Sequence, residues 1–258
     1  MPKVLRDLKS FYNTHRRDLP WRRTYDPYKI LVSEVMLQQT QVLRVIPKYE
    51  VFIKKFPTPQ KLAKAKLSEV LKLWSGLGYN RRAKYLHQAA KVMSSAKTLQ
   101  EGEMNGSPTP SRRVFAEQYT TEFLENLPGV GCYTARAIVA FAFNKPEVFI
   151  ETNIRTVFLH YFYSSLLQNT RMISDKELLP LVAQALKKSK MQPRDFYAAL
   201  MDYGSYLKQK GIKLNSRSKH YTKQSKFEGS RRQKRAARLR ALLARGASDV
   251  ELEKVLHS

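Results

Sequence analysis

Apolar residues recur every three or four positions along most of the chain, which is the spacing of one face of an α-helix. The pattern is clearest in three sets of positions: Leu67, Val70, Leu71 and Trp74; Ala135, Ile138, Val139 and Ala142; Phe196, Ala199, Leu200 and Tyr203. Few segments alternate with a period of two, and short β-branched runs such as residues 148–150 lie beside loops. We therefore predict an all-α protein of about ten helices.

Two stretches interrupt the helical pattern. Residues 98–113 are rich in Gly, Ser and Pro and predict a loop, and residues 211–230 form a second break rich in Lys, Ser and Arg. Residues 231–245 then predict a basic amphipathic helix. Ser248 and Glu251 predict a capping box for a last short helix. These two helices are typical either of a helix-turn-helix fragment or of an extension that docks on the rest of the chain.

The net charge is strongly positive and unevenly placed. The chain has 47 Lys and Arg against 21 Asp and Glu, a formal net charge of +26. Between Lys208 and Arg245 there are fourteen Lys and Arg and one acid, with His220, Tyr221 and Phe227 among them. Basic residues interleaved with aromatic rings favour a nucleic-acid partner. A solvated basic tail and an anionic membrane surface are the alternatives.

Cysteine and histidine usage narrows the chemistry. The single cysteine, Cys132, excludes an internal disulfide and a cysteine-ligated iron–sulfur cluster within these 258 residues. The five histidines are scattered, so no metal site is predicted. No apolar run approaches the roughly 20 residues of a membrane span, and the first ten residues do not resemble a signal peptide. We expect an intracellular protein of the bacterial cytoplasm, associated with the nucleoid, without a membrane partner.

A tight glycine turn lies between two helical patterns, in the sequence LPGVGCYTA at residues 127–135. Glycines let a backbone approach an anion closely, and amides at a helix N-terminus point outward. The spacing fits a phosphate cradle and an ordinary tight turn equally well.

Two carboxylates lie in apolar segments. Glu34 interrupts the helical run ILVSEVML, and burial there would raise its pKa, making it a candidate general acid. A continuous helix would also place Gln38 and Gln41 on the face of Glu34. Glu151 follows the apolar run VFI and begins the next helix, where the dipole favours its ionised form. One neutral and one ionised carboxyl group form the pair that cleaves a glycosidic bond.

Taken together, these segments resemble one family, the helix-hairpin-helix base-excision DNA glycosylases, and within it the MutY-like adenine glycosylases. The likeness runs from Leu19 to Gly204. It rests on SEVMLQQTQV at residues 33–42, WSGLGY at residues 74–79 and the glycine turn. The first motif is specific for the MutY-like branch, whereas the hairpin is shared across the superfamily.

The resemblance implies two helical subdomains of the HhH-GPD type, with a DNA-binding cleft between them and a base turned out of the duplex before its bond is cut. Glu34 resembles the acid that protonates the departing purine. Glu151 stands where the family has an Asp that stabilises the sugar cation, and Asn153 resembles the Asn beside it. Tyr133 stands where bifunctional relatives carry a lyase Lys, which implies a monofunctional enzyme.

The same resemblance, with the basic composition, implies contacts to DNA. Tyr79 and the glutamines resemble residues that insert around the lesion, and the glycine turn would bind phosphates through its amides. A monovalent cation is a candidate ligand of the hairpin, and no other cofactor is expected. The predicted DNA-binding residues are Gln38, Gln39, Gln41, Tyr79, Arg82, Leu127, Gly129, Val130, Gly131, Lys219, Lys223, Arg231 and Arg232.

Three features depart from the family. Glu151 is one methylene longer than the Asp, which displaces the carboxylate by about an ångström and costs about a hundredfold in rate unless the pocket suits the longer side chain. The four cysteines of the iron–sulfur cluster are absent after Gly204, and residues 208–245 are expected to bind phosphate in their place. We also expect the chain to lack the C-terminal domain that reads 8-oxoguanine.

The predicted organisation has four parts. Residues 1–23 form an N-terminal helix packing with the second subdomain. Residues 24–134 form a six-helix-type subdomain with Glu34 and the hairpin. Residues 135–207 form the second subdomain with Glu151, and residues 208–258 form a basic extension.

The sequence predicts a monomeric, monofunctional DNA glycosylase that hydrolyses the N-glycosidic bond of adenine opposite 8-oxoguanine or guanine in double-stranded DNA. A thymine or uracil mismatch glycosylase is the alternative within the class, because relatives of that type also carry Tyr at the hairpin position. A pyrimidine lacks the imidazole ring that a proton from Glu34 would reach, which favours adenine. A non-catalytic DNA-damage binder is the alternative from another class.

Overall fold

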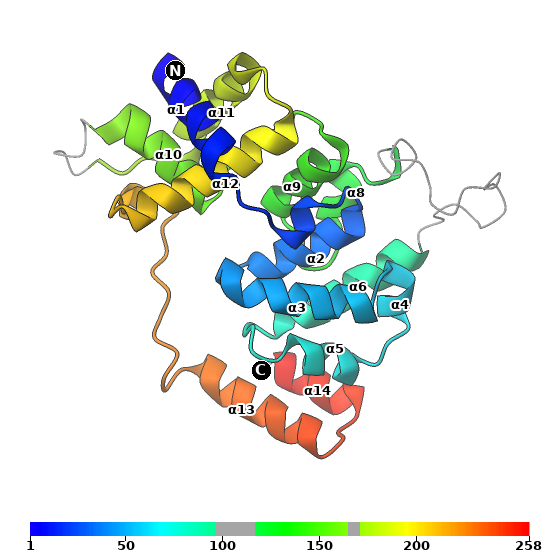
Figure 1. The fold of residues 1–258 in the computed structure, drawn as a ribbon. Coiled ribbons are helices and arrows are strands. Elements are labelled where there is room, and N and C mark those ends of the chain that lie inside the picture. The colour runs from blue at the N-terminus through cyan, green and yellow to red at the C-terminus, as the bar shows by residue number, and fades with distance from the viewer. Residues whose placement is uncertain (96–116, 165–170, 258) are drawn as a thin grey trace, which may run out of the picture. The chain divides into compact units, whose positions relative to one another are not determined.

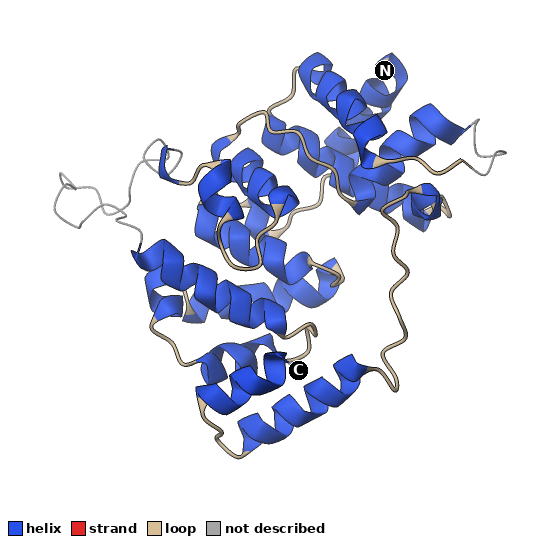
Figure 2. Cartoon of the chain, turned by 180° about the vertical axis from the view of Figure 1, so that it is seen from behind, coloured by secondary structure: helices blue, strands red, loops and turns tan. Residues whose placement is uncertain are grey.

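The structure is a computed structural model that describes residues 1–95, 117–164 and 171–257. This part of the chain consists of helices and loops, with no strand among the described residues, which confirms the all-α prediction (Figures 1 and 2). The loop predicted at residues 98–113 lies outside the described ranges. No described helix combines the length and the apolarity needed to cross a bilayer.

Most described helices follow one another through short connections, whereas residues 218–230 form a long one before residue 231. The α-helices are α1 (Pro2–His15), α2 (Pro27–Leu37), α3 (Val42–Lys55), α4 (Pro59–Ala63), α5 (Leu67–Trp74), α6 (Arg81–Ser95), α8 (Thr121–Glu125), α9 (Cys132–Phe143), α10 (Thr152–Tyr163), α11 (Asp175–Ser189), α12 (Pro193–Gln209), α13 (Arg231–Ala244) and α14 (Asp249–His257). Two 3₁₀ turns, η1 (Pro20–Arg22) and η3 (Leu214–Arg217), complete the described helical structure.

The chain divides into two compact units. Unit 1 comprises residues 1–18 and 139–223, and unit 2 comprises residues 19–138 and 224–258. The boundary falls inside α9, four residues beyond the predicted limit at residue 134, because the helix continues without interruption. The basic segment expected as one extension, residues 208–258, is divided between the two units at residue 223.

Helix α2 is the buried centre of unit 2. The side chain of Asp26 caps its first turn by accepting hydrogen bonds from the amides of Tyr28 and Lys29, at 2.9 and 3.4 Å, and Pro27 occupies the first helical position. Most of the α2 side chains, from Ile30 to Met36, are buried. A helix that is apolar all round is stable only when protein covers every face. A carboxylate carried by α2, such as that of Glu34, is therefore buried with it.

Helix α14 belongs to unit 2 because it docks on α5 and α6, as the red and cyan helices of Figure 1 show. The predicted capping box is confirmed, since Glu251 accepts from the amide of Ser248 at 3.0 Å and Ser248 accepts from the amide of Glu251 at 3.4 Å. The carboxylate of Asp249 accepts from the amides of Leu67 and Ser68, at 2.9 and 3.1 Å. Asp249 thereby caps α5, whose own N-cap residue makes no side-chain capping bond.

Unit 1 is built around α10 and α12. The two helices approach so closely that a Cβ atom at Gly204 would lie 2.2 Å from the backbone oxygen of Asn153. Helix α1 packs on α12, and the buried carboxylate of Asp202 accepts hydrogen bonds from the backbone amide and the Nε of Arg17, at 3.1 and 2.5 Å. These contacts fix the start of α10, where Glu151 and Asn153 lie.

The capping role of Asp249 predicts the effect of removing its carboxylate. In Asp249→Ala the free energy of unfolding falls by about 1–2 kcal/mol, because two backbone amides at the start of α5 lose their acceptor. Urea denaturation followed by circular dichroism measures the change. Val250→Ala, at a neighbouring side chain that is 65% exposed, is the control and changes stability by less than about 0.5 kcal/mol. Equal losses in both variants would contradict the capping role.

Candidate active site

Glu34 and Tyr133 form a hydrogen-bonded pair within unit 2. Glu34 lies on α2 and is 6% exposed. Tyr133 is the second residue of α9, and its hydroxyl donates to Oε2 of Glu34 at 2.9 Å. The glycine turn sets this position, because α9 starts immediately after it. Two residues that are 99 positions apart in the chain are thus brought together.

The phosphate cradle at the glycine turn stays a prediction, and the structure gives the backbone conformation of the turn. Gly129 has a φ of +76°, and a Cβ atom there would lie 2.7 Å from the Cβ of Tyr85, so no larger residue fits. Gly129 and Gly131 are exposed, and within the described residues their amides donate no backbone hydrogen bond. Two amides without a backbone acceptor before a helix suit an anion.

Leu127 and Val130 do not fit the DNA-binding role predicted for them. Both side chains are buried, with exposures of 2% and 7%. The amide of Leu127 donates to Leu124 at 3.1 Å, and the amide of Val130 donates to the carbonyl oxygen of Leu127 at 3.0 Å. The two residues therefore shape the turn, and the amides without a backbone acceptor are those of the glycines.

The glutamines do not share a helix face with Glu34, so that prediction was wrong. Helix α2 ends at Leu37, Gln38 follows as its C-cap, and Gln39 has a φ of 54°. Gln41 is the N-cap of α3. The glutamines therefore form a turn between α2 and α3, where Gln39 and Gln41 are exposed and Gln38 is half-buried.

Helix α2 ends at this point because a buried guanidinium binds its last carbonyls. Nη1 of Arg82 donates to the backbone oxygens of Val35, Met36 and Gln38 at 2.7, 2.9 and 2.5 Å. Nη2 donates to Oγ1 of Thr40 and, in the turn before α6, to the backbone oxygens of Leu77 and Gly78, at 3.0, 3.3 and 3.1 Å. These bonds replace the ones that a continuing helix would supply.

Arg82 is therefore a positioning residue, and the prediction that it binds DNA is corrected. Its side chain lies between elements of unit 2 and is 8% exposed. Burial lowers the pKa of Arg82 to about 10, with the guanidinium still charged at neutral pH. The guanidinium also lies over the rings of Trp74 and Tyr79, at 5.3 and 5.6 Å from their centroids.

Tyr79 is covered by the C-terminal segment. It has a φ of 48°, and its hydroxyl accepts from Nη1 of Arg232 at 2.5 Å and from the side-chain amide of Gln224. The Arg232 guanidinium also lies 5.0 Å from the centroid of the Tyr79 ring. The sequence contains no local signal for this contact, because the two residues are 153 positions apart.

Glu151 and Asn153 form a second polar pair, in unit 1. Oε1 of Glu151 accepts from the amides of Asn153 and Ile154 at 2.7 and 2.9 Å, and Oε2 accepts from Nδ2 of Asn153 at 3.3 Å. Glu151 is thus the N-cap of α10. The close approach of Gly204 to Asn153 holds this turn against α12.

The surroundings of Glu151 oppose its ionised form more strongly than the sequence predicted. Burial raises the pKa of Glu151, and the opposing effects of the capping amides, Lys208 and Arg155 do not reverse the direction. The helix dipole was therefore the weaker influence.

The remaining predicted DNA-binding residues lie at the surface. Lys219 and Lys223 are exposed in unit 1, and Arg231 is exposed at the start of α13 in unit 2. One cysteine does not fit an iron–sulfur cluster, which needs four thiolates, and the hairpin cation stays a prediction.

The raised pKa of Glu151 predicts a pH-dependent stability difference. A carboxyl group with a raised folded-state pKa contributes stability at low pH and loses that contribution as pH rises through the folded-state pKa. The melting temperature of Glu151→Gln minus that of the wild type therefore rises as pH increases above 4.5, the ordinary pKa of a Glu carboxyl group. Differential scanning calorimetry measures it.

Glu177 supplies a control of opposite sign in the same unit. Hydrogen bonds from the amide and hydroxyl of Ser174 lower the pKa of Glu177, so its ionised form stabilises the fold. The same difference for Glu177→Gln falls as pH rises toward 4.5 and is constant above it, because a lowered pKa confines the change to the acid side of the ordinary value. Parallel trends in the two variants would contradict the assigned direction for Glu151.

Comparison with known proteins identifies the family. A model described as HhH-GPD superfamily base excision DNA repair protein matches residues 32–184. The chain is 38% identical over 200 residues to the adenine DNA glycosylase of Mycolicibacterium smegmatis, which covers 77% of this chain and 61% of that protein. It is 36% identical over 207 residues to the adenine DNA glycosylase of Homo sapiens, covering 77% of this chain and 34% of that protein. The chain thus spans less than two thirds of the length of these relatives.

Solved structures agree with this match. A thermostable thymine-DNA glycosylase has a TM-score of 0.61 and 30% identity, covering 79% of this chain and 85% of that chain. The H. pylori 3-methyladenine DNA glycosylase bound to 1,N6-ethenoadenine has a TM-score of 0.55 and 19% identity, covering 82% of this chain and 98% of that chain, and supports the fold alone. The family match extends over more than half of the residues, and it includes Glu34, the glycine turn and Glu151. The chain therefore belongs to the HhH-GPD superfamily of base excision DNA repair proteins.

Proposed function

We propose that the chain is a monofunctional DNA glycosylase that hydrolyses the N-glycosidic bond of adenine opposite 8-oxoguanine or guanine. The observation that carries the proposal is the buried Glu34 carboxyl group, held by the Tyr133 hydroxyl at 2.9 Å beside the glycine turn. The adenine DNA glycosylases among the relatives support adenine as the base.

The proposed reaction uses two carboxyl groups in different roles. Glu34 donates its proton to a ring nitrogen of the extruded purine, so the base leaves as a neutral molecule when the bond to the sugar breaks. The ionised carboxylate of Glu151 stabilises the positive charge on the sugar, and water adds to the anomeric carbon with loss of a proton. Tyr133 carries no amine to attack the sugar, so the product is an abasic site on an intact strand.

Tyr133 contributes through its hydrogen bond to Glu34. The carboxyl group acquires negative charge as its proton leaves, and a donor already aimed at Oε2 stabilises that charge without rearrangement. An interaction that strengthens in the transition state raises the rate of the chemical step.

A thymine mismatch glycosylase is the second candidate. It is favoured by the likeness to the thermostable thymine-DNA glycosylase, which is similar over 85% of that chain. In either case the proposed partner is double-stranded DNA. A monomer acting in a bacterial cytoplasm without a bound cofactor completes the proposal.

The first prediction concerns Glu34. Single-turnover reactions on duplexes with A:8-oxoguanine, A:G, T:G and U:G, followed by alkali, reveal abasic sites. Strand breaks form at adenine, and Glu34→Gln lowers the rate about 10²- to 10⁴-fold because the proton donor is lost. The exposed Glu50 of α3 provides the matched control, and Glu50→Gln keeps the wild-type rate.

Two other patterns of strand breaks would contradict the proposal. Breaks at thymine or uracil in place of adenine would transfer the chain to the mismatch branch. No breaks on any duplex, with tight binding, would identify a damage-binding protein and overturn the enzymatic proposal.

The second prediction concerns Tyr133. Tyr133→Phe keeps the ring and removes the donor, and a hydrogen bond to a charged group contributes about 1.5–3 kcal/mol. The single-turnover rate at saturating enzyme therefore falls about ten- to hundredfold, with little change in DNA affinity. Tyr163→Phe, at the end of α10, is the control for loss of a tyrosine hydroxyl. An unchanged rate for Tyr133→Phe would exclude the hydroxyl from the chemistry.

A further inference from the structure

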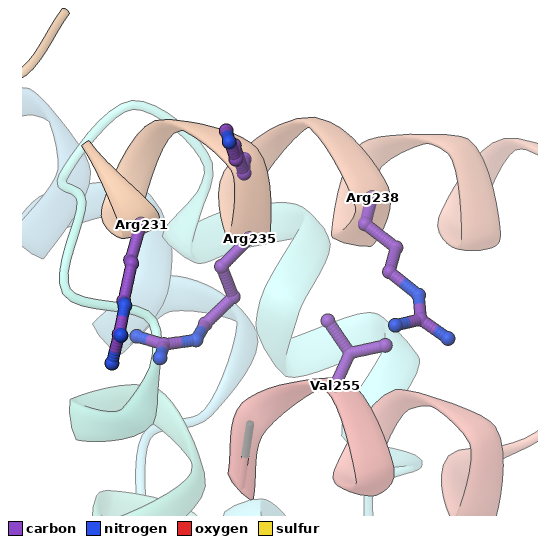
Figure 3. A pocket seen from close by; sticks show the side chains of 5 residues that line it. Arg231, Arg235, Arg238 and Val255 are labelled. Carbon is purple, nitrogen blue, oxygen red and sulfur yellow. The ribbon is translucent and has the colours of Figure 1, made fainter. Parts of the chain in front are cut away.

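A cavity lined almost entirely by cations lies between α13 and α14. Its volume is about 180 Å³, and its lining consists of Arg231, Lys234, Arg235, Arg238 and Val255. The four basic residues are spaced i, i+3, i+4 and i+7, so they form one stripe along α13. Figure 3 shows Arg231, Arg235 and Arg238 extending from the same side of α13, with Val255 of α14 between Arg235 and Arg238. We call this cavity the α13 pocket.

Among the described residues, no acidic side chain pairs with the cations of the α13 pocket. Each acidic residue of α14 is engaged elsewhere: Asp249 caps α5, Glu251 binds Arg245 at 2.5 Å, and Glu253 lies 3.7 Å from Lys84. Within the described residues, no ion pair forms with any of the four cations that line the pocket. In the described part of the chain, the stripe therefore has four positive charges and no ion pair to an acid.

One of these cations has a buried donor without an acceptor. Nε of Arg235 is buried and makes no hydrogen bond to any described residue. Arg81 lies at the end of α14, where its Nη2 donates to the backbone oxygen of His257 at 2.7 Å. It adds a positive charge that acts on Arg235. Burial and the charges of Arg81 and Arg231 lower the pKa of Arg235. A buried, unsatisfied donor among like charges is costly in a folded protein unless an anion binds it.

The chemistry of the lining selects the kind of anion. Guanidinium groups match phosphate oxygens with two parallel hydrogen bonds. The single apolar residue of the pocket is Val255, and the lining offers no aromatic ring for a base to stack on. The pocket therefore suits a phosphate group without its nucleobase.

The length and position of the stripe favour a polymer of phosphates. From Arg231 to Arg238 the helix rises by about 10 Å, which equals the axial length of about three phosphates on one DNA strand. Arg232 on the same helix binds Tyr79, in the turn that resembles the family's lesion-probing loop. A strand that reaches this turn can continue along α13.

We propose that the α13 pocket binds successive backbone phosphates of the DNA duplex that the protein repairs, through Arg231, Arg235 and Arg238. This inference rests on the proposed function for the identity of the duplex. It adds a phosphate-binding site on α13, separate from the glycine turn.

The test compares two positive charges in the pocket with two outside it. The double variant Arg235→Gln with Arg238→Gln removes two charges from the pocket. Arg240→Gln with Lys254→Gln is the matched control, because both residues are exposed and neither lines the pocket. Arg238→Gln alone is a second pocket variant at an exposed position, and melting curves establish that each variant folds.

Binding to a fluorescent A:8-oxoguanine duplex and to its fully paired counterpart is measured across a salt series. The pocket double variant binds both duplexes at least about tenfold more weakly. The slope of log K against log salt becomes less negative by about 0.9 for each phosphate that the variant no longer neutralises. The control double variant changes the affinity by less than about threefold, because its charges act only at long range.

The outcomes separate this inference from the proposed function. Equal losses in the pocket and control variants would show a general charge effect and overturn the pocket. Base release by the wild type, together with unchanged DNA binding in the pocket variants, would overturn the pocket and leave the function intact. Pocket-dependent DNA binding by a wild type that releases no base would support the pocket while the function fails.

A last experiment distinguishes binding of a free anion from binding of DNA. Inorganic phosphate and pyrophosphate are added to wild type and pocket variants in thermal-shift measurements. Stabilisation that depends on the pocket, without any effect of the variants on DNA binding, would assign the pocket to a soluble phosphate compound and overturn the proposal. Loss of DNA binding in the pocket variants, with weak or no stabilisation by free phosphate, is the expected result.

Discussion

The arrangement of unit 2 depends on one buried guanidinium. Arg82 binds the last carbonyls of α2 and the carbonyls of the turn before α6, so it ends one element and anchors another. A helix end buried without such partners would leave several acceptors unsatisfied. Because α2 stops there, Glu34 stays on a buried helix while the glutamines after it lie on a turn with exposed side chains. The same guanidinium lies over the ring of Tyr79. Tyr79 in turn connects the turn before α6 to the C-terminal segment through Arg232.

Local sequence pattern predicted the elements better than their ends. The apolar run around Glu34 predicted a buried helix, and the glycine turn predicted the start of α9 after it. The end of α2 was not predictable from α2 itself, because the residue that binds its carbonyls lies 44 to 47 positions further along the chain. A periodicity argument extends a helix until a breaker appears, and the glutamines are not breakers. The prediction that Glu34 and the glutamines share one helix face was wrong for this reason.

Charge arguments needed the environment that only the fold supplies. The sequence placed Glu151 correctly at the start of a helix, where the dipole favours the anion, but burial is the larger influence and raises its pKa. The basic segment after residue 208 was expected to act as one extension. In the structure α13 and α14 belong to unit 2, and Asp249 caps a helix that begins 182 positions earlier. Composition predicted an anionic partner. It did not predict that the positive charges along α13 have no ion pair, because this depends on the acids of α14 binding other residues in the fold.

The central claim is that a proton from Glu34 releases a purine from duplex DNA. The most direct measurement is chromatographic identification of the free base formed when A:8-oxoguanine and T:G duplexes compete in one reaction. The account predicts free adenine in an amount equal to the abasic sites formed, with no thymine released. Release of thymine alone would contradict the choice of substrate, and release of neither base would contradict the glycosylase reaction itself.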